Sequence, residues 1–181
     1  MPGREIINHK EQKDLTDLIK KDGGVLFAHG FDKKRKKYHT REFEKLIAKK
    51  FKSRFSLAVS SGTAALKIAL KSLGVKRGDE VITQAFNFIA TVEAILDTGA
   101  KPIIVDIDNT LNMCPKDLKK KISKRTKVII PVHMLGFPAD LEKIIDISMK
   151  KGIKIISDNC ESMGAKYKKK YINNFVDVEV F

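Results

Sequence analysis

The sequence has few cysteines and no long apolar run. It has only two cysteines, Cys114 and Cys160, which are too few for a disulfide framework and are not spaced as a metal-ligand pair. No apolar run approaches the roughly 18 residues that a membrane-spanning helix requires. The first residues, MPGREIINHKEQ, are polar and charged, unlike a secretory signal. We therefore expect a cytoplasmic protein in a reducing compartment, without a metal site or a membrane partner.

Acidic residues are also in deficit, with 22 Asp and Glu against 36 Lys and Arg, so that the net charge is +14. Such an excess of positive charge is typical of proteins that bind nucleic acid. Here, however, the lysines are spread along the chain in short clusters, as at 33–37, 119–121 and 168–170. Aromatic residues that could stack on bases do not alternate with them. The pattern favours a solvated surface, and we expect no nucleic-acid partner.

Apolar runs of strand length alternate with amphipathic helical patterns along the chain. The predicted strands are residues 55–60, 80–84, 102–107, 127–133 and 153–158, with a further strand beginning at 178–181. The predicted helices are residues 11–21, 40–52, 62–74, 88–99, 115–123 and 139–152. Strands that are apolar on both faces, separated by such helices, predict a three-layer α/β/α fold with a mostly parallel sheet.

The pattern also predicts how the chain is divided. Residues 1–40 are expected to form an N-terminal helix followed by a glycine-containing loop, and residues 41–181 to form the α/β domain. Gly74, Gly99 and Gly152 fall where helix C-caps are expected. The sequence ends inside the strand that begins at residue 178, and a domain seldom ends within a strand. We expect the chain to be the front part of a longer protein.

Ligands of open parallel sheets bind beyond the carboxyl ends of the strands, so the residues at these positions are candidate site residues. The segment SSGTAAL, residues 60–66, begins a helix at Gly62 and Thr63 directly after a predicted strand. Free N–H groups, a glycine and hydroxyls there suit an anion such as phosphate, although an ordinary Ser/Thr N-cap explains the same residues. Neither the Walker pattern nor G-x-G-x-x-G is present.

Aromatic and titratable residues follow two further strands. Phe86 and Phe88 follow the strand 80–84, where they either pack in the core or stack on a flat ligand. His133 ends the strand 127–133, and a structural role is the simpler interpretation of a single histidine.

Asp158 ends the apolar strand 153–158, and a buried carboxylate is costly without a partner. The partner is either nearby backbone or a cation, such as a protonated ring nitrogen. A phosphate cradle, an aromatic face and such a carboxylate together point to pyridoxal phosphate, which has a phosphate, a flat ring and a basic ring nitrogen.

The same residues lie in stretches that resemble the DegT/DnrJ/StrS family of pyridoxal-phosphate-dependent sugar aminotransferases. These stretches are REFEKLIAKKF, SSGTAALKIALKSLGVKRGDEVITQAFNFIATVEAILDTGAKPIIVDID, RTKVIIPVHMLGFPADLEKI and ISDNCESMGAKYKKK, in the order found in the family, from about residue 41 onward. The resemblance implies an aspartate-aminotransferase-like (fold type I) large domain, incomplete here. It also implies a homodimer whose active sites are shared between subunits.

The resemblance assigns roles to five residues. Gly62 and Thr63 would hold the cofactor phosphate, Phe88 would stack on the pyridine ring, and Asp158 would pair with the pyridine nitrogen. Glu161 occupies a position, near the ring hydroxyl, that is usually Gln or His in the family. A carboxyl group at this position is expected either to be protonated or to point elsewhere.

The family's Schiff-base lysine would lie beyond Phe181, so we expect these 181 residues alone to be inactive. The resemblance implies that the full-length protein transfers an amino group from an amino acid, expected to be glutamate, to a nucleotide-linked keto sugar. Two alternatives stay open. One is a sugar dehydratase of the same family with His in place of the lysine, and the other is a non-catalytic binding or regulatory member.

Overall fold

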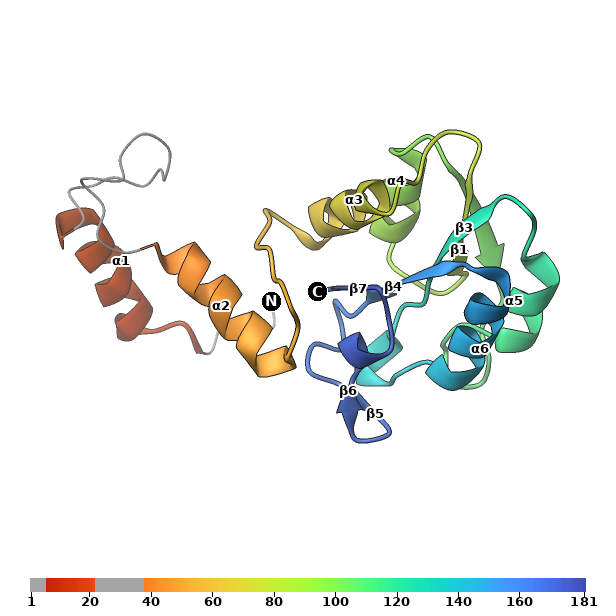
Figure 1. The fold of residues 1–181 in the computed structure, drawn as a ribbon. Helices are drawn as coiled ribbons and strands as arrows, with labels where there is room; N and C mark the ends of the chain where they lie inside the picture. The colour runs from red at the N-terminus through yellow and green to blue at the C-terminus, as the bar shows by residue number, and fades with distance from the viewer. Residues whose placement is uncertain (1–5, 22–37) are drawn as a thin grey trace.

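The computed structural model describes residues 6–21 and 38–181. Two helices, α1 (His9–Lys21) and α2 (His39–Phe51), precede the α/β body and extend away from it (Figure 1). The end of α2 is joined to the body by Phe51, whose ring centroid lies 5.0 Å from that of Tyr171 and 5.5 Å from that of Phe181. The predicted glycine-containing loop between α1 and α2 lies outside the described residues.

The body is built on a five-stranded sheet in which every pairing is parallel. In spatial order the strands are β2 (Lys101–Val105), β1 (Glu80–Gln84), β3 (Thr126–Ile130), β4 (Lys154–Asp158) and β7 (Val178–Val180). One face is covered by α3 (Gly62–Ser72) and α4 (Ala90–Leu96), and the other by α5 (Pro115–Lys121) and α6 (Leu141–Lys151) (Figure 1). The predicted three-layer fold is confirmed.

In the central strands β1, β3 and β4, successive apolar residues enter different cores, which explains their continuous apolar runs. In β1, Val81 packs in the cluster that contains α3 and α4, and Ile82 packs in the cluster that contains α5 and α6. In β4, Ile156 and Ile155 divide in the same way. A sheet with both faces covered requires such continuous apolar runs, since side chains alternate between its faces.

The helix boundaries follow the local sequence signals. Pro115 is the first residue of α5, where its missing N–H costs nothing. Gly152 ends α6 with a φ of 66°, as a left-handed C-cap. The remaining elements are short, namely the hairpin β5 (Lys166–Tyr167) and β6 (Lys170–Tyr171), and the 3-10 turns η2 (Met134–Gly136) and η3 (Ile172–Asn174). In residues 6–21 and 38–181, no helix combines the length and the hydropathy needed to cross a membrane.

The predicted strand at residues 55–60 is wrong, since this segment forms no strand. Phe55 and Leu57 are 77% and 68% exposed, and the N–H of Ala58 donates to the Glu44 carboxylate of α2 at 2.9 Å rather than to a neighbouring strand. Alternating apolar residues suit a strand, but a strand also requires an edge to pair with. The segment instead connects α2 to α3.

Candidate functional site

The carboxyl edge of the sheet holds a buried carboxylate that is bonded only to neutral donors. Asp158 is the last residue of β4 and is 4% exposed. Its Oδ2 accepts a hydrogen bond from the Thr91 hydroxyl at 3.1 Å, and its Oδ1 accepts one from the Cys160 N–H at 3.2 Å. Among the described residues no cationic side chain forms an ion pair with it. The site therefore has a negative charge that a cationic ligand could compensate.

The N-terminus of α3 lies against the loop that follows Asp158. A Cβ atom placed on Gly62 would lie 3.1 Å from the Cys160 Sγ, so this glycine permits a close approach. Ser61 is the N-cap, and its side chain accepts the Ala64 N–H at 3.1 Å. Within the described part of the chain, the N–H groups of Gly62 and Thr63 have no hydrogen-bond partner. Such free N–H groups at a helix N-terminus suit an anion.

Phe88 is linked to Asp158 through Thr91. It precedes α4, and its carbonyl accepts the Thr91 N–H at 3.2 Å, while the Thr91 hydroxyl bonds Asp158. The Phe88 side chain is 75% exposed, which excludes the core-packing interpretation in this chain. No ring contact with another described residue involves it, so its face is open to a flat ligand.

His133 has the structural role that the sequence favoured. It is fully buried, its Nε2 lies 2.8 Å from the Ser157 Oγ, and its Nδ1 accepts the Ala139 N–H at 2.8 Å. Burial lowers its pKa to about 4, so the ring is neutral at pH 7. Both ring nitrogens are occupied, which leaves neither for a substrate.

Glu161 is exposed, and its carboxylate is directed to the backbone of η2. Its Oε2 accepts the Leu135 N–H at 2.9 Å. The carboxylate thus bonds backbone in this structure, and its relation to a cofactor oxygen stays a prediction.

Three buried polar residues that organise this edge were not identified from the sequence. Thr91 bonds Asp158, as described above. The Gln84 side chain donates to the carbonyls of Phe86 and Leu111 at 3.1 and 3.2 Å and accepts the Val132 N–H at 3.1 Å. Asn112, also fully buried, bonds both ends of η2. The only sequence signal was a glutamine at the end of an apolar strand.

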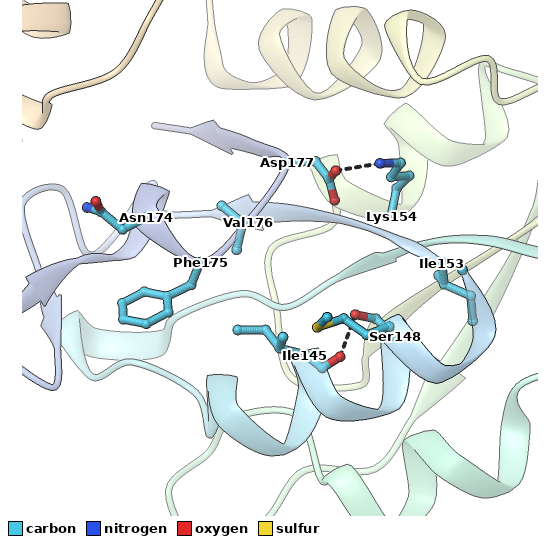
Figure 2. A pocket seen from close by; sticks show the side chains of 10 residues that line it. Ile145, Ser148, Ile153, Lys154, Asn174, Phe175, Val176 and Asp177 are labelled. Carbon is cyan, nitrogen blue, oxygen red and sulfur yellow. Dashed lines mark hydrogen bonds and ion pairs between the residues drawn. The ribbon is translucent and has the colours of Figure 1, made fainter.

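A cavity of about 380 Å³ opens at the opposite, amino edge of the sheet, between α6 and residues 174–177 (Figure 2). Its polar groups bond one another or the backbone. The Lys154 Nζ lies 2.8 Å from the Asp177 Oδ1, and the Asp177 Oδ2 accepts the Ile155 N–H at 2.9 Å. The Ser148 hydroxyl donates to the Ile145 carbonyl at 2.9 Å. These polar groups of the lining are therefore already paired, and the carboxyl edge of the sheet is the better candidate site.

Comparison with known proteins defines the class of protein to which this fold and site belong. Its architecture is that of the fold type I pyridoxal-phosphate enzymes. Residues 29–181 match the DegT/DnrJ/EryC1/StrS aminotransferase family, and the chain belongs to this family. The sequence-based predictions of the family, the fold class and the cofactor are thus confirmed.

Three relatives illustrate the similarity. GDP-perosamine synthase of Escherichia coli O157:H7 is 41% identical over 144 residues, which cover 79% of this chain and 40% of the relative. The structure of NtdA from Bacillus subtilis with bound cofactor PMP is 30% identical, with a TM-score of 0.80, over 96% of this chain and 38% of that chain.

The third is an H188N mutant of GDP-4-keto-6-deoxymannose-3-dehydratase (ColD) with bound GDP-perosamine. It is 34% identical, with a TM-score of 0.69, over 73% of this chain and 36% of that chain. The chain therefore spans less than half the length of each of these relatives.

Proposed function

We propose that the full-length protein is a pyridoxal-phosphate-dependent aminotransferase that moves an amino group from an amino acid, with glutamate as the expected donor, to a nucleotide-linked keto sugar. The family supports aminotransfer, and the similarity to the Escherichia coli GDP-perosamine synthase supports a GDP-linked sugar as the acceptor. The observation that carries the proposal is the buried Asp158 carboxylate, which has only neutral donors.

The residues at the carboxyl edge fit the cofactor. When bound, pyridoxal phosphate supplies an electron sink through its protonated ring. Asp158 would hold the proton on the ring nitrogen, because an ionised carboxylate in a buried site stabilises a neighbouring cation. Thr91 and the Cys160 N–H would orient that carboxylate, each through one of its oxygens.

The other predicted site residues would fix the position of the ring. The unpaired N–H groups of Gly62 and Thr63, with the Thr63 hydroxyl, would bind the phosphate. The exposed face of Phe88 would stack on the ring and exclude water from that side. Glu161 would contribute through the backbone that it bonds, since its carboxylate is directed to Leu135.

Cofactor binding is the first test. Equilibrium dialysis of the full-length protein against pyridoxal 5'-phosphate should give saturable binding, and Asp158→Asn should weaken it strongly. Asp177→Asn, at the opposite edge of the sheet, is the matched control and should bind as the wild type does. Absence of saturable binding, or equal binding by Asp158→Asn, would contradict the proposal.

Amino transfer is tested on the protein expressed from its full reading frame. With glutamate and a GDP-linked keto sugar, 2-oxoglutarate should form in an amount equal to that of the amino sugar. A protein that binds the cofactor but forms neither product would argue against this reaction.

A dehydratase of the same family is the second candidate, favoured by the 34% identity to the ColD dehydratase. The residue at the Schiff-base position of the full reading frame separates the two candidates. A lysine would support amino transfer, and a histidine would support dehydration with the same cofactor.

A homodimer is a further part of the proposal. Large apolar side chains are exposed on α2 and on the segment that follows it, and they are Phe43, Leu46, Phe55 and Leu57, between 51% and 77% exposed. Large apolar side chains exposed on two consecutive segments support an interaction site there. Analytical ultracentrifugation should show a dimer, and Leu46→Lys together with Leu57→Lys should yield monomers. A wild-type monomer at micromolar concentration would refute this part.

A further inference from the structure

The turn η2 combines a strained backbone with an exposed apolar side chain. Leu135 has a φ of 53° and a ψ of 27°, in the left-handed region that a leucine seldom adopts. Its side chain is nevertheless 64% exposed, so packing of that side chain does not explain the conformation. Strain of this kind persists only where surrounding contacts impose it, and it is concentrated at functional sites.

Two side chains from other parts of the fold hold this turn. Glu161, in the loop after β4, accepts the Leu135 N–H at 2.9 Å. Asn112, in the loop before α5, accepts the Met134 N–H at 3.0 Å and donates to the Phe137 carbonyl at 3.2 Å. The turn is therefore fixed at its start, its middle and its end.

The turn begins directly beside Asp158. Val132 pairs with Asp158 in a parallel bridge, and the His133 N–H donates to the Asp158 carbonyl at 3.1 Å. The Glu161 that bonds Leu135 is itself three residues after Asp158. Leu135 is thus held next to the residue proposed to bind the cofactor ring.

We infer that Glu161 is a positioning residue, whose carboxylate holds Leu135 in its left-handed conformation so that the Leu135 side chain contacts the sugar nucleotide. In this arrangement Leu135 determines how tightly the acceptor binds, and Glu161 does not touch the cofactor. The substrate contact rests on the proposed function, whereas the hydrogen bond from Leu135 to Glu161 does not.

Amide hydrogen exchange of the full-length protein tests the Glu161 contact without any activity. Glu161→Ala should accelerate exchange of the Leu135 amide by about tenfold or more, because the acceptor that this N–H has among the described residues is removed. Glu161→Gln keeps an acceptor oxygen and should stay within about threefold of the wild type. Glu142→Gln, an exposed carboxylate at the start of α6, is the control and should have no effect. Unchanged exchange in Glu161→Ala would overturn the inference.

A double-mutant cycle in the full-length enzyme tests the substrate contact. Glu161→Ala and Leu135→Gly should each raise the KM for the keto sugar nucleotide by about tenfold, with the cofactor dissociation constant changed less than about twofold. Because Glu161 acts through Leu135, adding Glu161→Ala to Leu135→Gly should raise the KM by less than about twofold more.

Three outcomes would count against the inference. Independent effects of the two substitutions would show that Glu161 does not act through Leu135. An altered absorption spectrum or dissociation constant of the bound cofactor in Glu161→Gln would place Glu161 on the cofactor. Absence of amino transfer by the wild type would refute the proposed function and the substrate contact with it, while the exchange data would still decide whether Glu161 holds the turn.

Discussion

The two edges of the sheet differ in the bonding partners that they provide for a buried carboxylate. At the amino edge, Glu80 is 4% exposed and accepts hydrogen bonds from the Arg125 guanidinium at 2.6 and 2.9 Å and from the Ser123 hydroxyl at 2.5 Å. Asp177 at the same edge is paired with Lys154. At the carboxyl edge, Asp158 is equally buried but has only a hydroxyl and a backbone N–H as donors.

This difference separates residues that stabilise the fold from residues that await a ligand. A buried carboxylate with a cationic partner has its desolvation offset within the chain. One with neutral donors alone retains part of that cost, which a cationic ligand can offset. The four variants below are arranged to test this contrast, and they begin with the largest expected effect.

Asp158→Asn should weaken cofactor binding without lowering the stability of the fold. We expect the affinity for pyridoxal 5'-phosphate to fall by about 100-fold or more, since a charge-assisted contact to the ring is lost. The free energy of unfolding without cofactor should change by less than about 1 kcal/mol, or increase, because an uncompensated buried charge is removed. Dialysis and urea denaturation measure the two quantities. A large loss of stability with unchanged affinity would show that Asp158 is structural.

Glu80→Gln should have the reverse effect. Loss of the charge-assisted hydrogen bonds to Ser123 and Arg125 should lower the free energy of unfolding by about 1–2 kcal/mol at pH 7, without altering cofactor affinity. The Ser123 hydroxyl, followed by Arg125, holds the pKa of Glu80 below its ordinary value. The stabilisation is therefore present at neutral pH and is lost as the pH falls through the acidic range.

Urea denaturation at several pH values checks this prediction. The difference between the wild type and Glu80→Gln should shrink toward acid, and a difference that is constant with pH would contradict the ionic origin. Glu142→Gln removes an exposed carboxylate that pairs with Lys168, and it should change stability by less than about 0.5 kcal/mol.

The sequence predicted those parts of the fold that depend on continuous patterns. Each strand of the parallel sheet was located to within a few residues, because burial on both faces demands unbroken apolar runs such as those of β1 and β4. The segment 55–60 has the same local pattern but no partner strand, and pairing is a property of the whole fold rather than of the segment.

The site was predictable to the extent that it depends on position along a strand. Asp158 was placed at the carboxyl edge because it ends an apolar strand, and ligands of parallel sheets bind there. Gly62 was placed there after the predicted strand 55–60, which does not form, although the N-terminus of α3 does lie against the loop that follows Asp158. The partners of these residues were not predictable. Thr91 is 67 residues from Asp158, and the Glu161 carboxylate bonds a backbone N–H whose residue type carries no signal. Contacts between loops at one edge depend on strand order, which spacing along the chain does not reveal.

Gly62→Ala tests a single contact at the carboxyl edge, between the N-terminus of α3 and the Cys160 thiol. The new methyl group would lie 3.1 Å from the Cys160 Sγ, so that the N-terminus of α3 or the loop must shift by a few tenths of an ångström. We expect cofactor affinity to fall by about tenfold, since the Gly62 and Thr63 N–H groups move from the phosphate.

Cys160→Ala in the same chain removes the sulfur and should restore most of the affinity, which dialysis would detect. Cys160 is exposed as a residue, but partial desolvation of its thiol, followed by the negative charge of the nearby Asp158, raises the pKa to about 12, so the thiol is not expected to react. Failure of the rescue would show that the loss in Gly62→Ala has another cause than this contact.

Glu179, on β7, is a carboxyl group whose effect on stability should depend on pH in the sense opposite to that of Glu80. Its Oε1 accepts a hydrogen bond from the Asn159 side chain at 2.6 Å, and no described cation forms an ion pair with it. Burial raises its pKa to about 7, so the folded protein favours the protonated carboxyl group. Its contribution to stability is therefore complete in acid and is lost as the pH rises through about 7, opposite to that of Glu80.

Glu179→Gln replaces the carboxyl group with a neutral amide of the same shape. At pH 8 it should raise the melting temperature by roughly 2–4 °C, equivalent to about 1 kcal/mol after allowance for partial exposure to solvent. At pH 4, below the ordinary glutamate pKa of 4.5, the variant and the wild type should melt at nearly the same temperature. Calorimetry at both pH values tests this prediction. A rise in melting temperature of equal size at both pH values would show that ionisation of Glu179 does not cause the rise. A gain confined to high pH would identify a second carboxylate near the carboxyl edge that the chain leaves without a cation, in contrast to Glu80.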